Sequence, residues 1–127
     1  MPEQEHILKC RDCEGKLVIF HRHNYDIHKK KHPELEDTAF FPDRVRNALK
    51  YPTFTIPGNG NSVTCYYVEE FSINGIIKYT KVVLMNKPYI MANEKIHHIM
   101  TAHKVGHVQE EKYPGLKKQM YHNGNKI

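Results

Sequence analysis

The sequence contains no tryptophan and only 3 cysteines among its 127 residues. Three cysteines are too few for the disulfide framework that holds small secreted domains together. No apolar run is longer than that of residues 82–85, whereas a transmembrane helix needs about 20 apolar residues. The N-terminal residues are polar and acidic, and they lack the basic start and apolar run of a secretory signal. These absences lead us to expect a cytoplasmic protein with no membrane partner.

Basic residues outnumber acidic ones. The chain has 19 Lys and Arg against 14 Asp and Glu, a formal net charge of +5, and 10 histidines that gain charge as the pH falls. A surface of this sign favours polyanionic partners, nucleic acid first among them. The length is that of one domain, and the hydrophobic content of 39 % is typical of a soluble globular chain.

The hydrophobic pattern predicts an order of elements along the chain. We expect a strand over 16–21, a helix from Asn24 to His32, a helix from Pro42 to Pro52, strands over 62–71 and 76–85 joined by an Asn74-Gly75 turn, and strands over 89–91 and 95–105. This order indicates an α+β domain, in which the N-terminal strand and two helices pack on one face of an antiparallel sheet of about four strands. The opposite sheet face would be free for a ligand.

Three parts of the chain follow from this order. We place the folded domain at 16–108, after an N-terminal segment (1–15) that contains a Cys-x-x-Cys turn. A C-terminal helix and tail occupy 109–127. Within the last long strand, alternation predicts one face with Ile96, Met100 and Ala102, and an opposite face with His97, Ile99, Thr101 and His103. His98 would then face away from Thr101.

The first group of residues that could carry chemistry is Cys10 and Cys13 with His21 and His23 close behind. Two thiolates and two imidazoles can complete a tetrahedral zinc site. The spacing between Cys13 and His21 is shorter than the roughly 12 residues of a zinc finger. The alternatives are therefore a compact structural zinc site and a surface turn with free thiols.

A second group lies on one expected helix face, because His28, Lys31 and His32 are spaced i, i+3 and i+4. This face would combine imidazoles that titrate near neutral pH with a fixed positive charge. Cleavage of a phosphodiester needs a base, an acid and a cation that stabilises the developing negative charge. The other interpretation is a solvated basic helix face.

A third group is found on the expected strands, where Tyr67, Lys78, Tyr79, Lys81, Thr101 and His103 combine aromatic, basic and polar side chains. Such side chains can stack on bases and hold phosphates. Taken singly, each also fits ordinary β-propensity or protection of a sheet edge. No acidic cluster suits a pair of magnesium ions, so we expect any nuclease activity to be independent of metal.

The order of these motifs resembles a known superfamily. A strand is followed by a helix with His28-Lys29-Lys30-Lys31-His32-Pro33, a helix that ends at Leu49-Lys50-Tyr51-Pro52, and antiparallel strands of which the last contains Thr101-Ala102. This pattern, over roughly 16–105, is similar to the small ribonucleases of the barnase, EndoU, colicin and RelE-like superfamily, in particular its phage- and toxin-associated branches. The resemblance implies an α+β toxin or mobile-element effector that cleaves RNA without metal and leaves a cyclic phosphate.

Carried over by position, the resemblance implies a set of roles. His28 would be the acid or base, Lys81 or Lys78 the cation, Thr101 the residue that orients substrate, and Tyr67 or Tyr79 the base-stacking residue. The expected catalytic residues are thus His28, His32, Lys81 and Thr101, and the expected substrate-binding residues are Lys31, Tyr67, Lys78, Tyr79 and His103.

The expected partners are RNA and an acidic antitoxin or immunity protein. Catalysis would need no cofactor, although a structural zinc at Cys10, Cys13, His21 and His23 remains an alternative. Two other functions stay open: a non-catalytic nucleic-acid-binding domain that uses the same basic sheet, and a zinc-stabilised interaction module.

Overall fold

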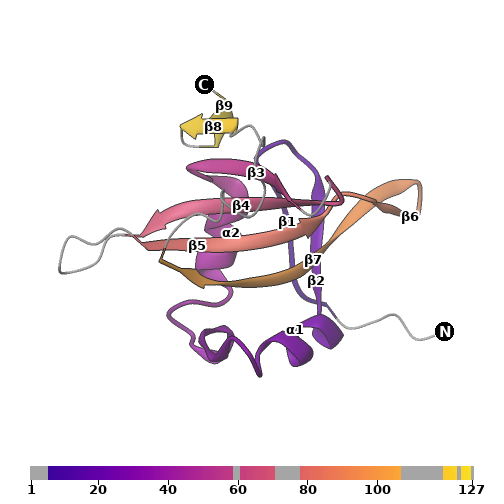
Figure 1. The fold of residues 1–127 in the computed structure, drawn as a ribbon. Coiled ribbons are helices and arrows are strands. Elements are labelled where there is room, and N and C mark those ends of the chain that lie inside the picture. Colours follow the sequence, from indigo (N-terminus) through magenta and orange to yellow (C-terminus); the bar gives the residue numbers. More distant parts are fainter. Residues whose placement is uncertain (1–5, 59–60, 71–77, 107–118, 123, 127) are drawn as a thin grey trace.

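A mixed, nine-stranded sheet dominates the computed structural model, which describes residues 6–58, 61–70, 78–106, 119–122 and 124–126 (Figure 1). The strands are β1 (His6–Arg11), β2 (Leu17–His21), β3 (Phe54–Gly58), β4 (Val63–Glu70), β5 (Lys78–Met85), β6 (Tyr89–Met91), β7 (Glu94–Val105), β8 (Gln119–His122) and β9 (Asn125–Lys126). The helices are α1 (Arg22–His28) and α2 (Asp43–Lys50), with a short 3₁₀ turn at Pro33–Glu36. None of the helices in the described part of the chain is long and apolar enough to cross a membrane.

The strand order is β1-β2-β7-β5-β4-β3-β8-β9, and β6 pairs with β7. All neighbours are antiparallel except β2 and β7, which run parallel. The expected antiparallel sheet of about four strands was therefore wrong, because the N-terminal strand joins the sheet instead of packing on it. The sequence pattern also missed β1, and it missed β3, which contains Pro57 and ends at Gly58.

The helices cover one face of the sheet. In Figure 1, α2 lies behind the central strands and α1 lies at one end of the sheet. α2 packs on β4 and β5, whereas α1 contacts β2 and β7. The core on this side contains Val18 and Phe20 of β2, Val45, Ala48 and Leu49 of α2, Tyr66 and Val68 of β4, Val82 and Leu84 of β5, and Ile99 and Ala102 of β7. The apolar stripe predicted for the second helix is confirmed by these contacts.

The opposite face of the sheet is buried over much of its described area, so it is not the free surface we expected. One apolar cluster gathers Phe54, Ile56, Val63, Cys65, Tyr67 and Val83. A second gathers Leu17, Ile19 and Ile96, with Tyr89 packed against them. We call this side the open face only to distinguish it from the helix-covered face.

A β-bulge changes the alternation along β7. Val83 pairs with Thr101 but Leu84 pairs with Ile99, so Met100 is an extra residue on β7. Ile99 and Ala102 consequently share the helix-covered face, and Met100 packs on the open-face cluster. The predicted grouping of Met100 with Ala102, and of Ile99 with Thr101, was wrong because it assumed an unbroken period of two.

Two further predictions about local structure need correction. α1 begins at Arg22 and ends at His28, without a side-chain cap. Asn24, where we expected the helix to begin, lies inside it, and its side-chain amide donates to the carbonyl of Ile99 (3.2 Å). The Asn74-Gly75 turn lies outside the described residues, as does most of the expected C-terminal helix, whose last described residues belong to the strand β8.

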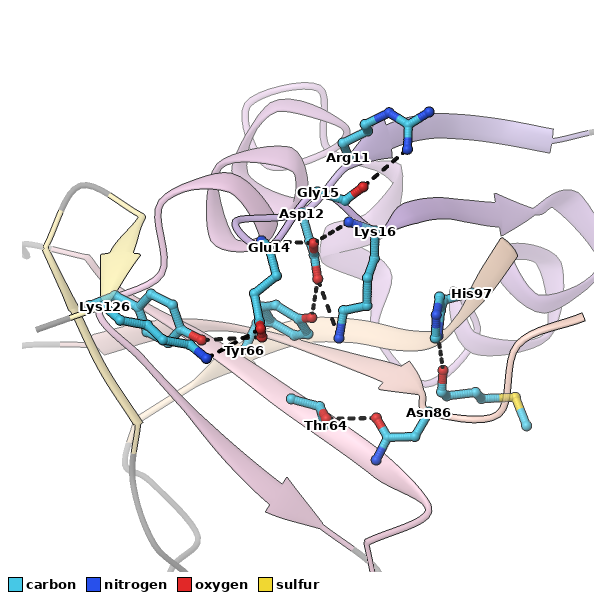
Figure 2. Close-up of polar contacts among 12 residues, drawn as sticks. Arg11, Asp12, Glu14, Gly15, Lys16, Thr64, Tyr66, Asn86, His97 and Lys126 are labelled. Carbon is cyan, nitrogen blue, oxygen red and sulfur yellow. Dashed lines mark hydrogen bonds and ion pairs between the residues drawn. The ribbon is translucent and has the colours of Figure 1, made fainter. Parts of the chain in front are cut away.

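The turn between β1 and β2 is anchored by a buried carboxylate, as Figure 2 shows. Asp12 Oδ1 accepts hydrogen bonds from the backbone N–H groups of Glu14 (2.9 Å) and Lys16 (2.8 Å). Asp12 Oδ2 accepts one from the hydroxyl of Tyr66 on β4 (2.5 Å). Burial, followed by the nearby Asp12, raises the pKa of Tyr66, so the phenol keeps its proton and remains the donor. The turn is thereby joined to the middle of the sheet.

This anchor predicts a loss of stability in Tyr66→Phe. The substitution removes the hydroxyl but leaves the Asp12 carboxylate buried. We expect the free energy of unfolding to fall by about 1.5–3 kcal/mol, the usual range for a hydrogen bond to a charged group, as measured by urea denaturation. The matched control is Tyr51→Phe, because Tyr51 is 54 % exposed. Equal stability of the two variants would contradict the role of the anchor.

Candidate active site

The end of β2 determines where the candidate site lies. β2 pairs with β7 only from Leu17 opposite Ile96 to Ile19 opposite His98. Beyond this point the chain turns into α1, and the segment after the helix reaches the second half of β7. There the His32 ring stacks on the His103 ring, with centroids 4.2 Å apart and planes at 10°. The backbone N–H of Lys104 also donates to Glu34 Oε2 (3.0 Å).

Three adjacent strands extend this contact into a row of side chains on the open face. Lys81 of β5 is paired with His103 of β7, and Tyr67 of β4 is paired with Lys81. Because directly paired residues point to the same face of a sheet, these three side chains lie side by side. Lys81 Nζ lies 5.7 Å from the centre of the Tyr67 ring. The bulge adds Thr101 to the same face.

Lys81 is a buried cation. The residue is only 7 % exposed. Within the described part of the chain, no carboxylate forms an ion pair with it. Buried charges in proteins are generally paired, so this position favours the arrival of an anion.

His103 lies in strongly positive surroundings. Burial lowers the pKa of its imidazole, and His32, Lys81 and His28 lower it further, while Glu34 opposes them, with a result of about 4. The ring is therefore neutral at neutral pH. Its Nδ1 and the hydroxyl of Thr101 are buried, and neither has a hydrogen-bond partner among the described residues. Two buried polar atoms on the same face of β7 thus have unused hydrogen-bonding capacity.

His28 completes a group of three imidazoles. Burial lowers its pKa, with smaller contributions from His32 and Lys31. The His28 carbonyl accepts the backbone N–H of His32 (2.9 Å), which keeps the two residues one turn apart although α1 ends at His28. The structure therefore brings His28, His32, Lys81, Thr101 and His103 into one cluster, which we call the histidine–lysine cluster.

Other predicted substrate-binding residues have different surroundings. Tyr67 is 2 % exposed and its ring stacks on Phe54, with centroids 5.1 Å apart, so it is a packed core residue in this structure. Lys78 and Tyr79 line a separate cavity of about 270 Å³, beside the ion pair of Arg44 and Glu70. Tyr79 is half-buried and remains open to a ligand on one side.

Lys31 is exposed directly before the stacked His32. Its backbone N–H donates to the carbonyl of His28 (3.1 Å). Its side chain is in contact with solvent, and its positive charge contributes to the lowered pKa of His28.

The structure does not bring the four predicted zinc ligands together. Cys10 packs against the helix-side core, whereas His21 lines a cavity with Ile19 on the open face. His23 is exposed on α1. Among the described residues, no group of three His, Cys, Asp or Glu side chains is arranged to hold a metal ion. The physical reason is that side chains alternate between the two faces along a strand, so that Cys10 and His21 point to opposite sides of the sheet.

The two thiols of the turn are also poor nucleophiles or ligands as they stand. Burial raises the pKa of Cys10. Burial and then Asp12 raise the pKa of Cys13 to about 11. Both side chains are consequently protonated thiols at neutral pH, and the thiolate is the form that reacts and binds metal.

Sequence reasoning missed two residues that position the histidine–lysine cluster. Glu34 fixes the segment after α1 to the backbone of β7, and Asn24 fixes α1 to the same strand through the Ile99 carbonyl. Their only sequence signal is a hydrogen-bonding side chain near the expected helix, which does not identify the strand that it contacts.

No protein-family model, curated protein or solved structure matches the chain.

The electrostatics of the cluster predict an unusual titration of His103. We expect its imidazole to titrate at about 4 instead of 6.5, as measured from its ring proton signals by NMR against pH. The unfolded chain then binds more protons than the folded chain between these values, so His103 reduces stability as the pH falls from 6.5 to 4. Lys81→Met should raise the pKa of His103 because it removes a neighbouring positive charge. An ordinary value in the wild-type protein would contradict the buried, cationic surroundings.

The separation of the thiols from the histidines predicts that stability does not depend on metal. We expect the urea midpoint to be the same before and after dialysis against EDTA, because the described residues form no closed ligand set that would couple zinc binding to folding. Zinc at one per chain, with a lower midpoint after chelation, would contradict this arrangement. Cys10→Ser tests whether any bound zinc uses the turn.

Proposed function

We propose that the protein is an endoribonuclease that cleaves RNA by attack of a 2′-hydroxyl on the adjacent phosphate. The chemical step would not need a metal, because side chains of the histidine–lysine cluster supply the acid, the base and the cation. The observation that carries the proposal is the stacked pair of His32 and His103 beside the buried Lys81. This is the combination that phosphodiester cleavage requires.

Each group would have a definite part in the reaction. The neutral His103 takes the proton of the 2′-hydroxyl while the 2′-oxygen forms a bond to phosphorus. The bond from phosphorus to the 5′-oxygen breaks, and His32 gives a proton to that leaving oxygen. The products are a 2′,3′-cyclic phosphate and a free 5′-hydroxyl. Lys81 and the Thr101 hydroxyl stabilise the charge on the non-bridging oxygens.

The low pKa of His103 in the free protein fits this scheme. A general base works best when its pKa is near the working pH. His103 is held at about 4 by burial and by neighbouring positive charges. A bound phosphate offsets those charges and raises the pKa of His103 towards neutrality. The imidazole would thus become an effective base when substrate is present.

The proposal agrees with the resemblance of the motifs to the barnase, EndoU, colicin and RelE-like ribonucleases. Within that superfamily, the chain would be a toxin or mobile-element effector. The basic cluster would then be the surface that an acidic antitoxin or immunity protein covers, since opposite charges steer such partners together.

The test is a cleavage assay on mixed RNA in the presence of EDTA. We expect the wild-type protein to release fragments that end in cyclic phosphate. His32→Ala and His103→Ala should each lower the rate by about 100-fold or more, the usual contribution of an acid or base. His28→Ala should lower the rate less, because His28 transfers no proton in this scheme. Lys81→Met should also lower the rate, because the developing negative charge loses its cation.

The matched control is His23→Ala, which removes an exposed histidine from the same helix as His28. Its rate should equal that of the wild type. Circular dichroism and urea denaturation of every variant separate loss of chemistry from loss of folding. RNA that is bound but stays intact would show that the protein is a nucleic-acid-binding domain and not an enzyme. Equal rates for all four histidine variants would show that the cluster takes no part in the reaction.

A further inference from the structure

A second feature of the open face is a cavity of about 540 Å³ at the other end of β7. This volume lies within the roughly 300–1,000 Å³ of small-ligand sites. Four strands contribute to the lining: β1 gives His6 and Lys9, β2 gives His21, β6 gives Tyr89 and β7 gives His98. The proposed chemistry of the histidine–lysine cluster uses none of these residues.

The wall of the cavity is a ladder of planar rings. Tyr89 stacks on His98 with centroids 4.3 Å apart. The His98 ring lies against the His21 ring, with centroids 4.4 Å apart and planes tilted by 31°. Burial lowers the pKa of both His21 and His98, so the two imidazoles are neutral. Neutral rings arranged in this way are suited to stacking with another flat aromatic ring.

His21 offers more than a ring surface. The residue is 9 % exposed, and neither of its ring nitrogens has a hydrogen-bond partner among the described residues. Buried polar atoms normally have partners. A neutral imidazole carries one donor and one acceptor, as do the edges of the nucleobases. His21 could therefore bind the edge of a flat heterocycle.

The charge of the lining indicates that the ligand is neutral or negative. The lining contains Lys9 and His6 at its exposed side and no carboxylate among the described residues. A base that carries a phosphate matches this combination of stacking rings, an unpartnered imidazole and a lysine.

The cavity and the histidine–lysine cluster share one strand and one face. His98 lies at the cavity, and His103 lies on the same strand in the cluster. At about 3.3 Å per residue, five residues of strand span roughly 15 Å. A few nucleotides of extended single-stranded RNA can cover this distance.

We propose that this cavity is a base-binding subsite, which holds one nucleobase of a single-stranded RNA whose backbone continues to the histidine–lysine cluster. The path of the RNA backbone to the histidine–lysine cluster rests on the proposed ribonuclease function, whereas binding of the base in the cavity does not. The base stacks on the ladder, its edge bonds to His21, and Lys9 pairs with the adjoining phosphate.

The first experiment measures binding without cleavage. Ring signals of His21 and His98 are followed by NMR while 5′-AMP, ribose 5-phosphate or inorganic phosphate is added. We expect 5′-AMP to shift both signals and the other two compounds to leave them unchanged. Equal shifts with ribose 5-phosphate would show that the cavity binds only the anion, and no shift with 5′-AMP would show that it binds no base. Either result overturns the proposal.

The second experiment distinguishes an RNA strand from a free nucleotide. A 2′-O-methyl hexaadenylate has no attacking hydroxyl, so it binds but is not cut. The hexamer should bind at least about tenfold more tightly than 5′-AMP. Tyr89→Leu should lower the affinity for the hexamer about tenfold, as expected for one lost base stack. The control Tyr51→Leu removes an exposed tyrosine outside the cavity. A hexamer that binds no better than the monomer overturns the RNA subsite.

Kinetics separate this proposal from the proposed function. Tyr89→Leu should raise KM for a long RNA about tenfold and leave the cleavage of a dinucleotide unchanged, because a dinucleotide does not reach the cavity. Equal effects on both substrates would overturn the subsite. Absence of cleavage by the wild type would overturn the ribonuclease function alone, since the NMR titration tests the base site independently.

Discussion

The short parallel pairing of β2 with β7 is the constraint on which both sites depend. It covers Leu17 to Ile19 on one strand and Ile96 to His98 on the other. Because β2 ends two residues later, at His21, the chain leaves the sheet as α1 and returns along the half of β7 that β2 does not pair with. That return places His32 on His103. The half of β7 that pairs with β2 instead carries the ring ladder, with the His98 ring against the ring of His21 on the neighbouring strand.

In the histidine–lysine cluster, Lys81 has no carboxylate partner among the described residues. Lys81 is buried next to a histidine whose pKa is lowered to about 4 by burial, His32 and Lys81. Placing cations together in a low-dielectric region is unfavourable until a negative charge arrives. A phosphate relieves this repulsion and at the same time makes His103 more basic. Binding and activation would therefore have the same electrostatic cause.

The sequence was informative where a local pattern decides the outcome. Val45, Ala48 and Leu49 predicted α2, and the apolar run at 17–20 predicted the strand β2. The predicted helix through His32 was too long, since α1 ends at His28, but a backbone hydrogen bond still joins His32 to His28. The parallel partner of β2 could not be predicted, because β-pairing between distant segments leaves no local signal. The four predicted zinc ligands are not brought together for a different reason, since Cys10 and His21 lie on opposite faces of the sheet.

The bulge at Met100 explains how one strand serves two sites on a single face. His98 and His103 are five positions apart, and in a regular strand two residues an odd number of positions apart point to opposite faces. The extra residue on β7 reverses the alternation after Ile99. Thr101 and His103 are thereby turned to the face that already carries His98, while Ala102 faces the helices. Bulges often re-aim side chains beside active sites. Without this one, the cavity and the histidine–lysine cluster would lie on opposite sides of the sheet, and no single RNA strand could reach both.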